Sequence, residues 1–159
     1  IDFSDELAEL EATAKKLVYR SADYLVNLYQ LPVALATDKA HLAGLQRFFA
    51  EELGMRVVIA EDTAEFSLDK MTEAAKQYKP VLLCGSSFLK NLADAQQVPL
   101  VRCAYPAFDQ LCFTDNTLVG ARGAALFIEQ IVNGALQQQY KAEGLYVGLR
   151  ESICEVNHE

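Results

Sequence analysis

The chain has 159 residues, and 52% of them are hydrophobic, which is enough apolar surface to bury the core of about one domain. Its net charge is −8 and it has no dense cluster of Lys and Arg, so nucleic acid and an anionic membrane surface are not expected as partners. No apolar run approaches the roughly 20 residues of a membrane span, and no secretory signal pattern is visible. We therefore expect a cytoplasmic protein.

The first expected element is a long helix over residues 2–29. Its apolar residues recur three or four positions apart, as on the buried face of a helix: Leu7, Leu10, Ala14, Leu17, Val18, Ala22, Leu25 and Leu28. Two interpretations of this face stay open. The helix packs across a neighbouring domain or subunit, or it covers one face of its own sheet.

Short apolar runs then alternate with helical patterns. Strands are predicted over 31–37, 55–60, 80–84 and 99–103, and a weaker pattern over 145–156 is compatible with a further strand. Helices are predicted over 39–53, 68–78, 87–95 and 120–138, with Asp38 and Ser67 as N-terminal caps of the first two and Gly54 as a stop signal.

This alternation predicts an α/β protein. The expected fold is a Rossmann-like three-layer αβα domain with a mostly parallel sheet of four to five strands, preceded by the long N-terminal helix. We divide the chain into that helix (1–30), the α/β domain (31–140) and a C-terminal tail (141–159). Because the chain opens on Ile1, we expect a fragment of a longer multidomain chain or a processed chain.

Ligands of parallel sheets bind beyond the carboxyl ends of the strands. There the turn Gly85-Ser86-Ser87 offers a flexible backbone, hydroxyl groups and amides that could face an anion, although a serine could simply cap the next helix. Arg102, at the next strand end, either pairs with Asp109 and fixes the turn between them or faces an anionic cofactor or partner. We take Gly85, Ser86, Ser87 and Arg102 as candidate cofactor-binding residues.

Several common chemistries are disfavoured. The sequence has no G-x-G-x-x-G and no Walker A motif, so an ordinary dinucleotide or P-loop site is not expected. The only histidines are His41 and His158, and G-x-S-x-G is absent, which argues against a hydrolase triad. We assign no catalytic residue.

The four cysteines contain no C-x-x-C pair: Cys84, Cys103, Cys112 and Cys154. Buried free thiols in a reducing compartment are the favoured interpretation. The first three could approach one another near the strand ends, but an iron–sulfur cluster generally needs four thiolates. We predict no metal ligand in this chain and no cofactor bound by this domain alone.

Four motifs in a fixed order suggest a family. They are Gly85-Ser86-Ser87 with Lys90, then Val98-Pro99-Leu100 with Arg102, then the turn Tyr105-Pro106-Ala107-Phe108-Asp109, and finally Gly120, Gly123 and Ala124 at the start of a long helix. In this order, residues 80–135 resemble the C-terminal domain of nitrogenase component 1 type oxidoreductases. The resemblance is best to the beta-chain type and to cofactor-assembly scaffold proteins.

The chain departs from that family pattern at three positions. Ala104 stands where the family usually has Gly, Gln110 where Arg often follows the turn Asp, and Cys84 where an aliphatic residue is usual. The cofactor-ligating His of the alpha-type chains has no match in 110–119. The resemblance therefore transfers no metal ligand to this sequence.

By resemblance, the parent is a nitrogenase-like multi-electron reductase subunit that serves nitrogen fixation, or an iron–molybdenum cofactor assembly scaffold. It would carry an iron–sulfur cluster or an iron–molybdenum-type cofactor. Its partners would be a homologous component 1 subunit, in a homo- or hetero-oligomer, and an ATP-dependent iron–sulfur reductase protein. This domain would supply cavity walls and subunit contacts and be inactive alone. The alternatives are a module that binds a small anion or metabolite and a structural subunit-interaction domain.

Overall fold

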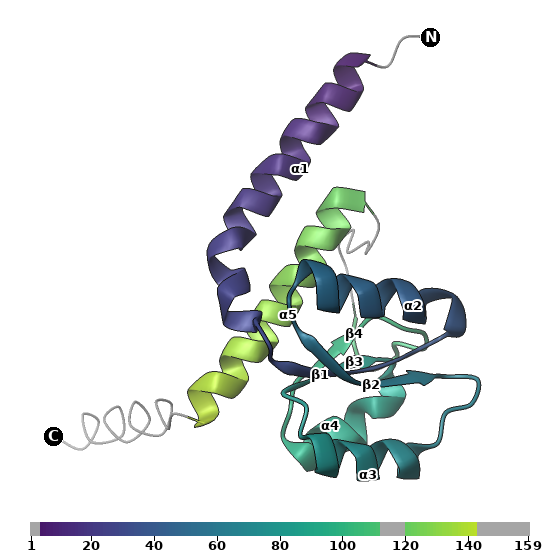
Figure 1. Ribbon diagram of the computed structural model, residues 1–159. Coiled ribbons are helices and arrows are strands. Elements are labelled where there is room, and N and C mark those ends of the chain that lie inside the picture. Colours follow the sequence, from purple (N-terminus) through teal and green to yellow (C-terminus); the bar gives the residue numbers. More distant parts are fainter. Residues whose placement is uncertain (1–3, 112–119, 143–159) are drawn as a thin grey trace, which may run out of the picture.

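A four-stranded parallel sheet forms the centre of the chain, whose computed structural model describes residues 4–111 and 120–142 (Figure 1). The strands are β1 (Pro32–Thr37), β2 (Arg56–Asp62), β3 (Leu82–Gly85) and β4 (Leu100–Arg102), in the order β2-β1-β3-β4. All three neighbouring pairs are parallel. The expected Rossmann-like α/β fold is confirmed, and the predicted strand over 145–156 lies outside the described residues.

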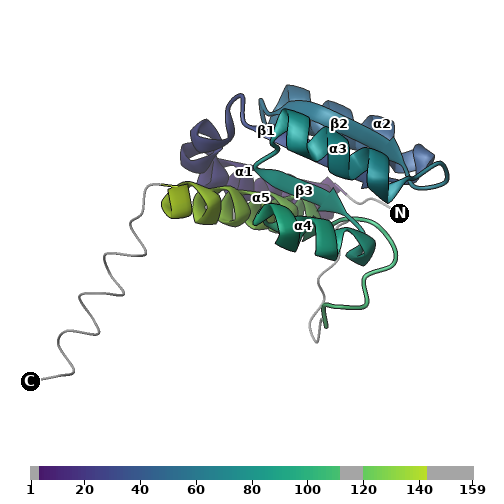
Figure 2. The same ribbon diagram turned by 90° about the horizontal axis from the view of Figure 1, so that it is seen from below.

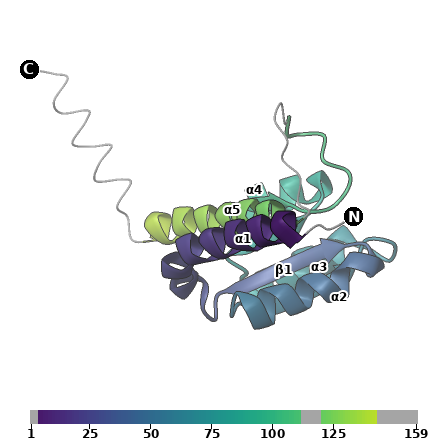
Figure 3. The same ribbon diagram turned by 90° about the horizontal axis from the view of Figure 1, so that it is seen from above.

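Helices cover both faces of this sheet. They are α1 (Ser4–Leu25), α2 (Lys39–Arg47), α3 (Leu68–Tyr78), α4 (Lys90–Gln96) and α5 (Gly120–Ala142), with one-turn 3-10 helices at Val26–Leu28 and Ser87–Leu89. Figure 2, seen from the α3 and α4 side, shows these two helices over the strands. The opposite face carries α2 and α5, and α1 lies alongside α5 (Figure 3). Within the described residues, no helix combines the length and apolar character needed to cross a bilayer.

Alternation along the strands divides the core into two layers. Leu35 and Leu82 belong to the cluster under α2 and α5, which also contains Phe127. The intervening residues, such as Ala34 and Leu83, belong to the cluster under α3 and α4. Most of these side chains are fully buried, so the sheet is covered on both faces, as the apolar strand runs predicted.

Local signals placed the helix starts correctly. Asp38 Oδ1 accepts hydrogen bonds from the Ala40 and His41 amides at 3.1 and 3.3 Å, and Ser67 accepts one from Lys70. The predicted helix over 39–53 is not regular to its end. It continues from α2 as a π-helical turn, Phe48–Glu52.

This wide turn accompanies an aromatic cluster. The rings of Phe48 and Phe49 both contact Phe127 of α5, with centroids 5.9 and 5.8 Å away. Consecutive side chains of a regular helix point about 100° apart, so the altered turn helps two adjacent rings reach one partner.

The topology creates one distinctive point at the sheet's edge. After β1 the chain turns to the α2 and α5 face, whereas after the neighbouring β3 it turns to the α3 and α4 face. The carboxyl ends of β1 and β3 therefore diverge, which is the topological switch point where open α/β sheets bind ligands. The Gly85-Ser86-Ser87 turn begins there.

Candidate functional site

The turn after β3 needs glycine at its first position. A Cβ on Gly85 would lie 2.6 Å from Leu89 Cδ1 and 2.7 Å from the Ala36 carbonyl oxygen. The Gly85 carbonyl in turn accepts the amide of Cys103 at 3.0 Å, just after β4. Close packing against β1 and the following helix is thus the structural reason for this residue.

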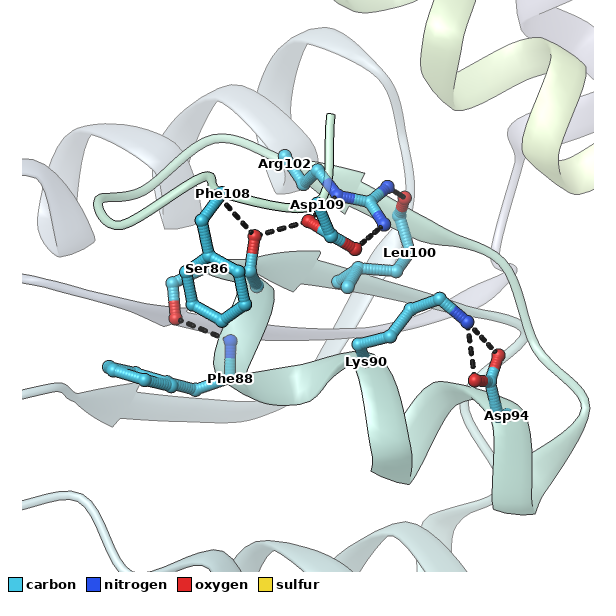
Figure 4. Close-up of polar contacts among 9 residues, drawn as sticks. Ser86, Phe88, Lys90, Asp94, Leu100, Arg102, Phe108 and Asp109 are labelled. Carbon is cyan, nitrogen blue, oxygen red and sulfur yellow. Dashed lines mark hydrogen bonds and ion pairs between the residues drawn. The ribbon is translucent and has the colours of Figure 1, made fainter. Parts of the chain in front are cut away.

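Ser86 and Ser87 have different partners, although both are almost fully buried. Ser86 Oγ accepts the Phe88 amide at 3.3 Å, so it caps the 3-10 turn. Ser87 reaches the loop after β4 instead: its Oγ donates to Asp109 Oδ1 and accepts the Phe108 amide at 3.1 Å (Figure 4). The Ser87 amide donates to the Pro106 carbonyl at 2.8 Å. This loop contains a cis peptide bond between Tyr105 and Pro106.

Arg102 and Asp109 form an ion pair across the same loop (Figure 4). Arg102 Nε donates to Asp109 Oδ1 at 2.8 Å, Nη2 donates to Oδ2, and Nη1 donates to the Leu100 carbonyl at 3.1 Å. The two side chains are only 18% and 21% exposed. Hydrogen bonds from Arg102, and then from Ser87, hold the pKa of Asp109 well below its ordinary value.

The structure therefore brings all four candidate residues to one edge and gives each a structural role. Gly85 permits close packing, Ser86 caps a helical turn, and Ser87 and Arg102 fix the loop through Asp109. Of the two alternatives for Arg102, pairing with Asp109 is the one observed. The assignment of these residues to cofactor binding stays a prediction.

Beside Ser86 lies a small cavity of about 80 Å³ at the carboxyl ends of β1 and β3. Its lining is mainly apolar and contains no cationic side chain: Ala36, Thr63, Phe66, Ser86, Phe88, Leu89 and Tyr105. Two of these residues also belong to an exposed surface that we call the edge aromatic patch, formed by Phe88, Tyr105 and Phe108.

In the edge aromatic patch, Tyr105 is 92% exposed, Phe108 69% and Phe88 61%. The rings of Phe88 and Phe108 contact each other with centroids 5.9 Å apart. Contiguous exposed aromatic surface marks interaction sites more often than scattered apolar residues do. Sequence reasoning missed this patch; the available signal was the placement of Phe88 and Phe108 in turns rather than in strands.

The described residues offer no ready metal site. They contain no group of three or more His, Cys, Asp or Glu side chains arranged to hold a metal ion. Burial raises the pKa of Cys84 well above its ordinary value and that of Cys103 to about 12, so both are neutral thiols in the chain without metal. Cys112 and Cys154 lie outside the described residues. What is described does not fit an iron–sulfur cluster.

The fold, together with the contacts at the carboxyl ends of its strands, defines a Rossmann-like α/β domain with a rigidly fixed loop at its switch point. A family model described as nitrogenase component 1 type oxidoreductase matches residues 61–136. The solved structure "Nitrogenase Cp1 at pH 6.5" superimposes with a TM-score of 0.75 at 21% identity, over 84% of this chain and 34% of that chain, and shows the same fold.

Curated relatives agree with the family model. The nitrogenase molybdenum-iron protein beta chain of Methanococcus maripaludis is 26% identical over 140 residues, which cover 73% of this chain and 30% of the relative. That of Frankia alni is 29% identical over 157 residues, covering 82% and 30%. The family model and these relatives both support the nitrogenase component 1 type oxidoreductase family for this chain. The chain spans about a third of the length of the curated relatives it matches.

Proposed function

We propose that this chain is the C-terminal α/β domain of a nitrogenase-like component 1 protein, of the beta-chain or cofactor-assembly scaffold type. The observation that carries the proposal is the family match over 61–136, which runs from β2 through the fixed loop and most of α5. The matched region thus contains most of the candidate site at the carboxyl ends of the strands, which we call the carboxyl edge. The similarity to molybdenum-iron protein beta chains supports the subunit type.

Within such a parent, the carboxyl edge would form one wall of a cavity. The loop after β4 is tied to β3 through Ser87 and to β4 through Arg102, so this wall keeps its shape. The edge aromatic patch gives it an apolar, uncharged surface that a neighbouring part of the parent would cover. The ion pair of Arg102 with Asp109 leaves the local charge balanced.

Further features of the parent follow from the same proposal. It would hold an iron–sulfur cluster or an iron–molybdenum-type cofactor outside this domain. It would work in the cytoplasm with a homologous component 1 subunit and an ATP-dependent iron–sulfur reductase protein. Its activity would be multi-electron reduction or cofactor assembly for nitrogen fixation.

The native protein tests this proposal. Antibodies against the 159-residue chain should detect a much longer polypeptide in the source cells, and anaerobic purification of that polypeptide should yield protein-bound iron. Phe88→Ala with Tyr105→Ala in that protein should lower its iron content or its reductase activity. Tyr78→Ala on α3, which removes another exposed ring, should leave both unchanged. A native polypeptide of about this length without iron contradicts the proposal.

The cavity of about 80 Å³ at the switch point favours a second candidate, a module that binds a small anion or metabolite. Because the lining contains no cationic side chain, an anion in this cavity would depend on the hydroxyl group of Ser86. The candidate predicts that phosphate or a small carboxylate raises the melting temperature of the chain. Ser86→Ala should abolish the shift, whereas Ser67→Ala, which removes the serine cap of α3, should retain it. The absence of any shift in the unmodified chain counts against this candidate.

A further inference from the structure

Three polar side chains of the described part of the chain are almost fully buried. Thr37 is 1% exposed, Ser86 4% and Ser87 3%. Thr37 and Ser87 each donate their hydroxyl proton to an aspartate. Ser86 Oγ only accepts, from the Phe88 amide (Figure 4). Among the residues that the structure describes, the hydroxyl proton of Ser86 therefore has no acceptor.

This unpaired proton lies beside a cavity. Ser86 lines the hollow of about 80 Å³ at the carboxyl ends of β1 and β3, which we call the switch-point cavity. A buried donor without an acceptor destabilises a fold, because the group has given up its hydrogen bonds with water. A serine hydroxyl can accept and donate at the same time. An acceptor placed in the switch-point cavity would thus pair the proton of Ser86 while the bond from the Phe88 amide is kept.

The rest of the lining carries no charge. Apart from Thr63 it consists of apolar and aromatic side chains: Ala36, Phe66, Phe88, Leu89 and Tyr105. Phe88 and Tyr105 also belong to the edge aromatic patch, so the cavity adjoins that patch. A charged group in such surroundings would lose its hydration without gaining a counter-ion.

We propose that the switch-point cavity binds an uncharged group in which a hydrogen-bond acceptor, such as a carbonyl oxygen, is attached to a small aliphatic body. Ser86 donates to the acceptor, and the aliphatic part contacts Ala36, Phe66 and Leu89. An ammonium group offers no acceptor for the Ser86 proton, and a carboxylate finds no cation in the lining. The inference thus narrows the second candidate above, an anion or metabolite module, to uncharged ligands.

Two sources can supply this chemistry. One is an aliphatic residue in a neighbouring part of the parent, with its side chain in the cavity and its backbone carbonyl on Ser86. That source rests on the function proposed above, in which a neighbouring part covers the edge aromatic patch. The other is a free amide or ketone. Either occupant is small, because the cavity is well below the roughly 300–1,000 Å³ of pockets for drug-sized ligands.

NMR titration of the 159-residue chain with two matched probes tests the inference. Isobutyramide and isobutyrate share one aliphatic body, but only isobutyramide is uncharged. Isobutyramide should shift the amide signals of Ser86, Phe88 and Leu89 with a Kd of about 10–50 mM, as expected for so small a ligand, and isobutyrate should bind at least about fivefold more weakly. Ser86→Ala should weaken the binding of isobutyramide about fivefold. Ser67→Ala, which removes the serine cap of α3, should leave it unchanged.

A second variant tests the cavity independently of the hydrogen bond. Ala36→Val adds methyl groups to a wall of the cavity and should abolish the binding of isobutyramide, whether or not Ser86→Ala folds. Absence of any shift with isobutyramide at about 0.2 M overturns the inference, and so does isobutyrate that binds as tightly as isobutyramide.

A third probe distinguishes the two sources. N-acetylvaline N-methylamide carries the same branched body between two peptide groups, which would contact the edge aromatic patch. If it binds about fivefold or more tightly than isobutyramide, the occupant is a polypeptide segment; equal or weaker binding assigns the cavity to a free molecule. The length and iron content of the native polypeptide do not depend on these titrations, so failure of this inference is separate from failure of the proposed function.

Discussion

Arg102 donates two hydrogen bonds to Asp109, one to each carboxylate oxygen, across the six residues that separate them. Asp109 also accepts a hydrogen bond from Ser87, which follows β3. One carboxylate thus joins the ends of two neighbouring strands. The charge of Arg102, which a ligand-binding role would present to solvent or substrate, is instead used to hold the loop that carries Tyr105 and Phe108.

Replacing Arg102 by Lys should lower the free energy of unfolding by about 1–2 kcal/mol. A lysine keeps the charge but cannot donate to both carboxylate oxygens and to the Leu100 carbonyl at once. Urea denaturation followed by circular dichroism measures the change. Arg47→Lys is the matched control, because its partner Glu51 is exposed and that pair should contribute little. Equal stability of Arg102→Lys and the unmodified chain would contradict the structural role.

The Asp109 carboxylate should make the chain sensitive to acid. Its folded-state pKa is depressed below the ordinary value of 3.8, chiefly by hydrogen bonds from Arg102, so its contribution is fully present above about pH 4 and is lost as the pH falls further. Asp109→Asn should therefore be less stable than the unmodified chain at pH 7, and the difference should shrink between pH 4 and pH 2. Chemical denaturation across this range measures both.

The exposed pair at the end of α2 supplies the comparison for this prediction. Glu51→Gln removes a carboxylate that also pairs with an arginine, but with side chains 76% and 57% exposed. Its effect on stability at pH 7 should be smaller than that of Asp109→Asn, because solvent screens an exposed ion pair. A stability difference for Asp109→Asn that stays constant down to pH 2 would show that the charge of Asp109 is unimportant.

Local sequence features were sufficient to predict most of the fold. The apolar strand runs and the caps Asp38 and Ser67 act within a few residues, so they are readable without a structure. The π-helical turn at Phe48–Glu52 was not predicted, because it accompanies contacts with Phe127, which lies far away in the sequence.

In the candidate site too, contacts between residues close in the sequence could be predicted, whereas contacts between distant residues could not. Pairing of Arg102 with Asp109 could be anticipated because the two residues bracket one short turn. The bond from Ser87 to Asp109 joins residues 22 positions apart and depends on the pairing of β3 with β4. The edge aromatic patch likewise arises where two separate loops meet. The sequence shows which residues are available, but only the sheet order brings them together.

The two described cysteines should resist alkylation. In the native chain, burial raises the pKa of Cys103 from 9.0 to about 12, and that of Cys84 well above 9.0. The thiolate fraction of Cys103 at pH 8.5 is then about a thousandfold below that of a free thiol. With Cys112→Ser and Cys154→Ser in place, iodoacetamide should modify neither residue natively and both in urea, as mass spectrometry would show.

The same thiols predict the behaviour of the chain at alkaline pH. Because burial raises the folded-state pKa of these thiols, the stability that they contribute in their neutral form is fully present below about pH 9. It declines as the pH rises toward 12. The described residues contain no group of three or more His, Cys, Asp or Glu side chains that could hold a metal ion, so anaerobic incubation of the chain with iron and sulfide at neutral pH should leave less than one iron per chain. About four irons per chain, lost on Cys84→Ala, would contradict this account of the cysteines.

Gly85→Ala should be the most damaging small substitution at the carboxyl edge. Its Cβ would lie 2.7 Å from the Ala36 backbone oxygen, which cannot move without distorting β1, as well as 2.6 Å from Leu89. We expect a loss of about 1–3 kcal/mol in the free energy of unfolding. Gly44→Ala, in α2, is the matched control: an added Cβ there meets nothing within 4 Å, and alanine should stabilise the helix by about 0.5–1 kcal/mol. Urea denaturation of both variants measures the two opposite shifts. If Gly85→Ala were as stable as the unmodified chain, the close packing of β1 against the turn after β3 could not be the reason for glycine at this position.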